Sequence, residues 1–239
     1  MRGITMTIKK SLGDRMKGYE NIPRHYLMKR TPVIIRLDGK AFHTYTRSCK
    51  KPYDVSLHYT RSCALEYLCT NIQGVIIGYA QSDEISLVLK DWQTYNTSAW
   101  FDNNLQKLVS ISASMCTMKW NSVASICGPL SPNAVFDSRA FNLPKEEVVN
   151  YLIWRQQDWE RNSIQMLAQS FYSPKQMHGV NCAQLVTKVE QEHGVIWGNL
   201  EPWKKQGEVW LPGGLIHERY LFKDNRVDLD NLLNTNNED

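Results

Sequence analysis

Two apolar runs that each end in acidic residues constrain the fold of this chain more than any other feature. The first run covers residues 33–37 and is followed directly by Asp38 and Gly39. The second covers residues 75–80 and leads into Gln81-Ser82-Asp83-Glu84, after which a third apolar run covers residues 85–89. Short β-branched runs bounded by turn residues predict buried strands. The chain is therefore expected to place carboxylates at the ends of buried strands.

The predicted order of elements brings these carboxylates to one edge of a sheet. Helices are expected at residues 54–72 and 102–118 and a further strand at 134–141, with Asp54 as the N-cap of the first helix. The order β-α-β-β-α-β predicts an α+β, ferredoxin-like domain whose two helices cover one face of an antiparallel sheet. A right-handed crossover makes the first two strands parallel, and the third runs back between them. Asp38 should then lie beside the turn that carries Asp83 and Glu84.

The chain is expected to form a catalytic domain at residues 1–143 and a C-terminal extension at residues 144–239, packed together as one compact unit. The extension should contain a long helix that starts at Pro144, a shorter helix at 181–193 and small strands and loops at 194–222. The Asn- and Asp-rich tail, residues 224–239, is expected to fray, and residues 1–5 are expected to carry no structure.

The composition is that of a soluble globular protein. Of the 239 residues, 42% are hydrophobic and 22% charged, and no apolar run reaches the length of a membrane span. The first residues lack the apolar stretch of a signal peptide, and the six cysteines show no zinc spacing, so reduced thiols in a cytoplasmic protein are expected. The net charge of +4 is compatible with a nucleic-acid or nucleotide partner and equally with an ordinary solvated surface.

Asp38 and Asp83 are candidate magnesium ligands. Mg²⁺ takes oxygen ligands, often one or two carboxylates together with substrate phosphates, and Gly39 lets its own carbonyl come close to a ligand. Each motif alone has a structural alternative, because Asp-Gly is a common turn pair and Asp83-Glu84 suits a hydrophilic hairpin turn. The expected meeting of the two strand ends favours the metal site.

Basic residues that follow the first strand suggest a triphosphate site. Lys40, Lys50, Lys51 and the start of the helix at 54–72 would neutralise phosphates. Phe42 is expected to anchor the core rather than stack on a base. For several other residues, a structural and a functional interpretation both remain open. They are His43 (a loop histidine or a phosphate contact), Arg139 (a surface residue or a phosphate contact), and Arg155 and Arg161 (a charged helix face or contacts to an RNA end).

Five ordered motifs resemble those of the tRNA(His) guanylyltransferase family. They are residues 36–43 (RLDGKAFH), 51–54 (KPYD), 79–84 (YAQSDE), 136–139 (FDSR) and 151–156 (YLIWRQ), within a resemblance that covers residues 14–165. The resemblance implies a palm domain like that of DNA polymerases and nucleotide cyclases. It also implies addition of nucleotides to the 5′ end of tRNA in the 3′-to-5′ direction, after activation of that end by ATP.

The resemblance also implies roles for individual residues. Two Mg²⁺ ions would bind Asp38, the Gly39 carbonyl and Asp83, with Glu84 supporting the metal site. The binding site for ATP or GTP would be lined by Asp38, Gly39, Lys40, Ala41, Phe42, His43, Ser82 and Asp83. Substrate or tRNA contacts would come from Lys51, Asp54, Lys107, Arg139, Arg155, Arg161 and Asn162. Family members are often homotetramers.

This chain departs from the family pattern at two places that the family uses for substrate contacts. Where eukaryotic members carry His-Ile-Asn-Asn, it has Glu160-Arg161-Asn162-Ser163, and Asn104 replaces a basic residue before Lys107. The first difference resembles the guanylyltransferase-like branch associated with template-dependent repair of tRNA 5′ ends, and the second removes one substrate contact of eukaryotic members. Strict addition of one guanosine to tRNA(His) is the alternative. A nucleotide cyclase and a non-catalytic RNA-binding module remain further alternatives.

Overall fold

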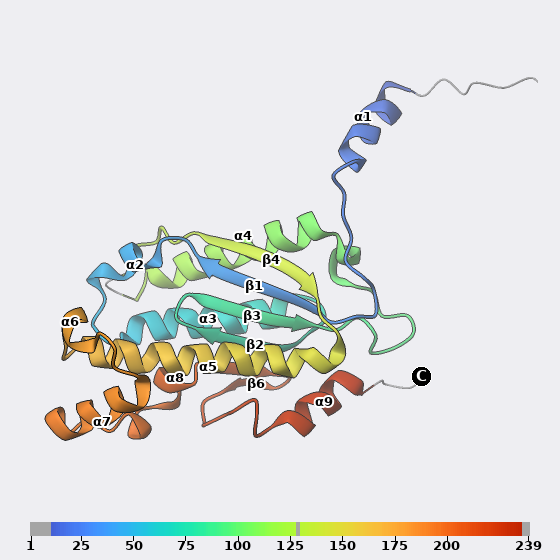
Figure 1. Cartoon of the computed structure of the whole chain (residues 1–239). Coiled ribbons are helices and arrows are strands. Elements are labelled where there is room, and N and C mark those ends of the chain that lie inside the picture. Colours follow the sequence, from blue (N-terminus) through green and yellow to red (C-terminus); the bar gives the residue numbers. More distant parts are fainter. Residues whose placement is uncertain (1–10, 128–129, 236–239) are drawn as a thin grey trace, which may run out of the picture.

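A six-stranded sheet in the order β4-β1-β3-β2-β5-β6 organises the molecule (Figure 1). The computed structural model describes residues 11–127 and 130–235. The strands are β1 (Val33–Gly39), β2 (Val75–Gln81), β3 (Glu84–Leu89), β4 (Phe136–Asn142), β5 (Glu208–Leu211) and β6 (Gly214–Ile216). Strand β3 pairs antiparallel with both β1 and β2, so β1 and β2 are parallel. The predicted α+β fold and strand order are confirmed. The expectation for residues 1–5 lies outside the described residues.

Helices α3 (Val55–Asn71) and α4 (Leu105–Ala124) cover one face of the sheet, as predicted. Alternate residues of β1, such as Ile35 and Leu37, belong to this core together with Trp120 of α4. Asp54 caps α3 by accepting from the backbone N–H groups of Ser56 at 2.8 Å and Leu57 at 3.0 Å, which satisfies two of the unpaired amides of the first turn.

The second predicted helix begins later than expected. A short 3₁₀ turn, η2 (Trp100–Asn103), precedes α4, and Phe101, Asp102 and Asn103 all have positive φ. Left-handed residues cannot continue a right-handed helix, so the helix starts only after Asn104. The Asn104 side chain caps α4 by accepting from the Lys107 amide at 3.1 Å.

Helix α5 (Lys145–Gln169) lies across the other face of the sheet (Figure 1). It begins after Pro144, as predicted, and Glu146 and Glu147 occupy its first turn, where negative charge is favourable. Val149 and Leu152 pack there with sheet residues that face away from α3 and α4. The central strands are therefore buried on both faces, which explains their continuous apolar sequence.

The C-terminal extension adds two strands to the same sheet. Strand β5 pairs with β2, so the sheet continues past residue 143. Helix α7 (Cys182–His193) packs on the end of α5, and the remaining short elements are α6 (Pro174–Met177), η3 (Trp197–Asn199) and α8 (Pro202–Lys205). All six cysteines are free. None of the described helices is both long and apolar enough to cross a membrane.

The tail does not fray as expected, because residues 226–234 form helix α9 (Arg226–Asn234). Leu229 and Leu233 are buried in the core below α5, and Lys90 donates to the Leu232 carbonyl at 3.0 Å. The prediction weighed only the polar composition of the tail and missed two leucines at helical spacing. Residues 236–239 lie outside the described part. At the other terminus, α1 (Leu12–Asn21) stands away from the body and buries no residue (Figure 1).

Candidate functional site

The end of β1 meets the turn between β2 and β3. Asp38 lies opposite Glu84 in the β1–β3 register, and the Gly39 amide donates to the Asp83 carbonyl at 3.1 Å. The strand topology therefore brings Asp38 next to the turn that carries Asp83. Gly39 is required here for packing, because a Cβ at this position would lie 2.2 Å from the Phe42 ring. Phe42 is buried against Trp120 and belongs to the core, as predicted.

Asp83 carries a charge that the protein does not neutralise. Burial raises the pKa of the Asp83 carboxyl to about 6, and the nearby charges of Asp38 and Glu84 act in the same direction. A hydrogen bond from Ser82 and one from the backbone offset this only in part. Within residues 11–127 and 130–235, the ion pairs of this region go to Glu84 and Asp158, and none goes to Asp38 or Asp83.

Glu84, in contrast, is fully engaged by two arginines. Arg155 donates to it from Nε at 2.7 Å and from Nη2 at 3.0 Å. Arg36 adds an ion pair, with its Nε 3.0 Å from Glu84 Oε2 but not aligned as a hydrogen bond. The buried carboxylate of Glu84 therefore holds the turn in position, beside Asp38 and Asp83, which pair with no cation in the described part of the chain.

Arg155, a predicted RNA contact, binds protein carboxylates in this structure. Its side chain is buried and binds Asp158 at 3.1 Å in addition to Glu84. The guanidinium donates to two carboxylates in this arrangement, and its contact with RNA stays a prediction. The sequence pattern around Trp154 showed an arginine on a helix but not which carboxylates would face it.

Asp38 and Asp83 fit a magnesium site of the kind that substrate phosphates complete. The structure shows no group of three or more His, Cys, Asp or Glu side chains arranged for a metal within its described residues. Mg²⁺ does not require such a cage, since one or two carboxylates with phosphates and water suffice. Two carboxylates without cation partners at one strand end, next to the Gly39 carbonyl, meet that condition.

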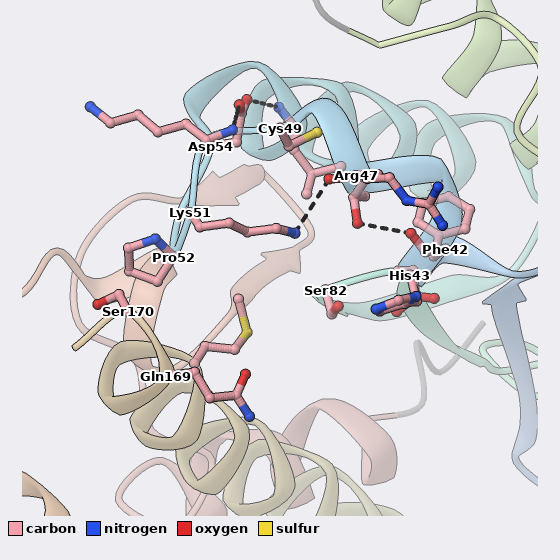
Figure 2. Close-up of a pocket in the computed structure, with 15 residues that line it drawn as sticks. Phe42, His43, Arg47, Cys49, Lys51, Pro52, Asp54, Ser82, Gln169 and Ser170 are labelled. Carbon is pink, nitrogen blue, oxygen red and sulfur yellow. Dashed lines mark hydrogen bonds between the residues drawn. The ribbon is translucent and has the colours of Figure 1, made fainter. Parts of the chain in front are cut away.

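Asp83 helps to line a cavity of about 590 Å³, here called the basic cavity. Figure 2 shows this cavity with Ser82 of the same turn labelled. Its cations come from the segment between β1 and α3, and they are His43 when protonated, Arg47, Lys50 and Lys51. Figure 2 shows Lys51 extending into the cavity, where its Nζ donates to the Thr46 carbonyl at 3.3 Å. Gln169 and Ser170, at the end of α5, form the opposite wall. The volume and charge suit a nucleoside triphosphate.

Asp54 shapes the wall of the basic cavity. One carboxylate oxygen caps α3 and the other accepts from the Lys50 amide at 2.8 Å, which fixes the lysine-bearing loop. Asp54 therefore has a structural role in addition to the substrate contact that the resemblance implies. Lys40 is exposed, but its backbone amide already donates to the Val135 carbonyl at 2.8 Å and so is not free for phosphate. Ala41 starts α2 (Phe42–Tyr45) with a φ of 54°.

A second cavity of about 380 Å³, here called the amide cavity, lies on the α5 side of the same turn. Asp38, Gln81, Asp158, Trp159, Asn162 and Gln165 contribute to its lining. Both cavities touch Ser82, Asp83, Met166 and Gln169, so they meet at Asp83. Sequence reasoning missed most of these α5 residues, although positions 155, 158, 162, 165 and 169 recur at helical spacing and predict one polar face.

The remaining predicted contacts are spread more widely. Lys107 lies in the first turn of α4, near the start of β1 and thus at the end of the sheet remote from Asp38. Arg139 is exposed on β4 opposite Arg36. Arg161 is exposed and paired with Asp158, and Asn162 lines the amide cavity. Asp137, which the predictions did not include, lies opposite Asp38 in the β1–β4 register.

Several known proteins resemble this chain in sequence and in fold. A sequence model described as tRNAHis guanylyltransferase matches residues 13–144, more than half of the chain. A solved bacterial tRNA(His) guanylyltransferase (Thg1)-like protein in complex with ATP is 42% identical, with a TM-score of 0.90 over 94% of this chain and 100% of that one. A similar bacterial structure in complex with GTP is 39% identical, with a TM-score of 0.79 over the same shares.

Sequence relatives extend the comparison. The chain is 29% identical over 236 residues to an uncharacterized protein of Acanthamoeba polyphaga mimivirus, covering 87% of this chain and 80% of that one. It is also 31% identical over 162 residues to the tRNA(His) guanylyltransferase of Schizosaccharomyces pombe, covering 65% of this chain and 59% of the relative.

Proposed function

Because the chain belongs to the tRNA(His) guanylyltransferase family, whose members are nucleotidyltransferases, we propose that it adds nucleotides in the 3′-to-5′ direction to the 5′ end of tRNA. The proposal includes dependence on Mg²⁺ and activation of the RNA 5′ phosphate by a nucleoside triphosphate. Activation attaches a nucleoside monophosphate to the 5′ phosphate and releases pyrophosphate. The 3′ hydroxyl of the incoming nucleotide then attacks the activated phosphorus and displaces that nucleoside monophosphate.

The observation that carries the proposal is the position of Asp38 and Asp83, two carboxylates without cation partners, next to the basic cavity. Asp38, Asp83 and the Gly39 carbonyl would hold the Mg²⁺, which when bound supplies positive charge to the attacking hydroxyl and the leaving phosphate. Lys50, Lys51 and Arg47 would bind the triphosphate. Glu84 keeps the turn in place through its two arginines.

Nucleotide choice is supported by the solved relatives. The bacterial Thg1-like proteins were determined in complex with ATP and with GTP. We propose the same two nucleotides for this chain, ATP for activation and GTP or another nucleoside triphosphate for addition. The basic cavity lies where a triphosphate would reach Asp83.

Template-dependent repair of a shortened 5′ end is the form of the activity that we favour. The stretch Glu160-Arg161-Asn162-Ser163 replaces the histidine-containing motif of eukaryotic members. Asn162 of this stretch lines the amide cavity beside Asp83. Strict addition of one guanosine to tRNA(His) is the second candidate, supported by the similarity to the Schizosaccharomyces pombe enzyme.

We further propose a homotetramer that acts in the cytoplasm. Helix α1 exposes Leu12, Met16 and Tyr19 without packing on the body, and a ten-residue helix is marginal alone in water, so contact with another subunit would stabilise it. The six free cysteines fit a reducing compartment. Sedimentation analysis tests the assembly.

One assay tests the proposed activity. Purified protein is given a tRNA that lacks its first nucleotide, labelled nucleoside triphosphates and Mg²⁺, and the base opposite the gap is varied. Incorporation that follows the template base supports repair, whereas guanosine alone on tRNA(His) alone supports the second candidate. Absence of incorporation with both substrates, under conditions where the protein is folded, contradicts the proposal.

A further inference from the structure

The amide cavity contains polar groups that have no partner within the described protein. The Gln81 side chain is 3% exposed, and its Oε1 has no hydrogen-bond partner among the described residues. Trp159, also 3% exposed, has an Nε1–H without a partner in the same part of the chain. Both residues line the amide cavity. Buried polar groups are normally paired, so two unpaired ones beside a cavity indicate a site that a ligand completes.

The charge of this cavity excludes a phosphate as its main ligand. Among the described residues that line it, Arg155 is the one cation, and Glu84 and Asp158 already bind its guanidinium. Asp38 and Asp83 add negative charge at the rim shared with the turn. An anion would be repelled unless a metal ion bridged it to these carboxylates. A neutral polar ligand has no such difficulty.

The lining offers hydrogen bonds of both kinds together with apolar surface. Side-chain amides of Gln81, Asn162, Gln165 and Gln169 each combine an acceptor oxygen with a donor nitrogen, and Trp159 and Met166 supply apolar contact. This is the chemistry that recognises a ribose and a base, which carry hydroxyls, ring nitrogens and flat apolar faces. The basic cavity, in contrast, gathers its cations on the other side of Ser82 and Asp83.

We propose that the amide cavity binds the uncharged nucleoside moiety, ribose and base, of a nucleotide whose phosphate or hydroxyl reacts at Asp83. The proposal rests on the nucleotidyltransferase function proposed above and names the substrate part that the second cavity takes. Two sources share this chemistry: the 5′-terminal nucleotide of the RNA and the nucleoside of the incoming triphosphate. Because a triphosphate fits the basic cavity on the opposite side, the RNA terminus is the source that the geometry favours.

Variants that delete the unpartnered groups test this. Trp159→Phe deletes the unpartnered indole N–H, and Gln81→Met deletes the unpartnered amide. Matched controls exist, because Trp210 and Gln206 are also buried and also carry an unpartnered Nε1 and Oε1, yet they do not line the amide cavity. Kinetics are measured on a 5′-shortened tRNA. The RNA concentration is varied at saturating triphosphate, and then the triphosphate concentration is varied at saturating RNA. Thermal melting is recorded for each variant.

We expect Trp159→Phe and Gln81→Met each to raise the KM for RNA about tenfold, the loss typical of a neutral hydrogen bond. The melting temperature of Gln81→Met should be unchanged or higher, because its deleted amide bonds to no described protein group. Trp159→Phe also loses buried ring volume, so its melting temperature should fall, as that of Trp210→Phe should. Trp210→Phe and Gln206→Met should leave both KM values within twofold. A tenfold rise in the KM for the triphosphate alone also supports the site and assigns it to the incoming nucleoside. Unchanged KM values in both cavity variants overturn the proposal.

A binding measurement separates this inference from the proposed function. Guanosine and adenosine, which carry no phosphate, are titrated into the wild-type protein and the Trp159→Phe variant by calorimetry. Inorganic triphosphate is present as a competitor for the basic cavity. Binding that survives the competitor and weakens about tenfold in Trp159→Phe supports the site even if no RNA is extended. Failure of wild-type protein to extend any RNA would contradict the proposed function alone, whereas equal nucleoside binding by both proteins would contradict the inference alone.

Discussion

Arg155 donates to both carboxylate oxygens of Glu84, at 2.7 and 3.0 Å, and thereby ties helix α5 to the turn that carries Asp83. The two residues are 71 positions apart in the sequence and are both buried. The same guanidinium binds Asp158 at 3.1 Å, so one side chain joins the site to the polar face of α5. This contact makes the position of the turn that carries Asp83 depend on the packing of the long helix.

Replacing Arg155 with methionine should destabilise the fold and lower activity together. Removing one partner of a buried ion pair costs about 3–5 kcal/mol of unfolding free energy. Because Glu84 keeps its contact with Arg36, we expect a loss near the lower end of this range. Chemical denaturation measures this change. The double variant Arg155→Met/Glu84→Gln should recover part of the stability, because the buried charge of Glu84 is removed while Arg36 loses its ion-pair partner. Arg161→Ala, which breaks an exposed pair with Asp158, is the control and should cost less than about 1 kcal/mol.

Asp83→Asn should abolish activity and yet stabilise the metal-free fold. The folded pKa of Asp83, about 6, lies above its ordinary value of 3.8, so the ionised carboxylate opposes folding at pH 7 and its removal is favourable. Turnover should fall at least about a hundredfold, since even outer partners of metal ligands cost 10–100-fold. Melting in EDTA and incorporation assays measure the two effects. A variant with a lower melting temperature would contradict the reading of Asp83 as a carboxylate held without a cation.

Glu208 should make the stability of the protein depend on acid pH. Burial would raise its pKa, but Arg61 at 2.5 Å outweighs this, with help from His58 and Ser62, and lowers the pKa to about 2. Because the folded pKa lies below the ordinary value of 4.5, the stabilisation is complete above pH 4.5 and is lost as the pH falls towards 2. Glu208→Gln should cost about 3 kcal/mol at pH 7, and its difference from wild type should shrink below pH 4.5. A pH-independent difference in unfolding free energy would refute this.

Lys51→Ala should weaken triphosphate binding without affecting the fold. Its ammonium extends into the basic cavity and its one described hydrogen bond is to the Thr46 carbonyl. We expect the KM for the nucleoside triphosphate to rise about tenfold, in line with the loss of a charge-assisted bond, with melting unchanged. Lys107→Ala is the matched control. Its charge lies at the remote end of the sheet, so the KM for the triphosphate should not change, and any effect should appear in RNA binding and its salt dependence.

The parts of the site that could be predicted from the sequence are those set by local pattern and chain topology. The apolar runs at 33–37 and 75–80 predicted β1 and β2, and the handedness of the crossover placed β3 between them. Helix α9 was missed, because its polar composition hid two buried leucines. The start of α4 was placed too early, because no sequence pattern indicated the left-handed residues at Phe101 to Asn103.

The sequence by itself determined that Asp38 and the Ser82-Asp83-Glu84 turn would meet, because strand periodicity and crossover handedness act through the backbone and need no side-chain detail. Only the tertiary structure decided how the three carboxylates differ. Glu84 is neutralised by Arg36 and Arg155, while Asp38 and Asp83 have no cation among the described residues. The free energy of a charge depends on its burial and on which groups distant elements bring beside it, and neither quantity can be read from neighbouring positions in the chain. The amide cavity on the α5 side of this turn arises from the same long-range packing.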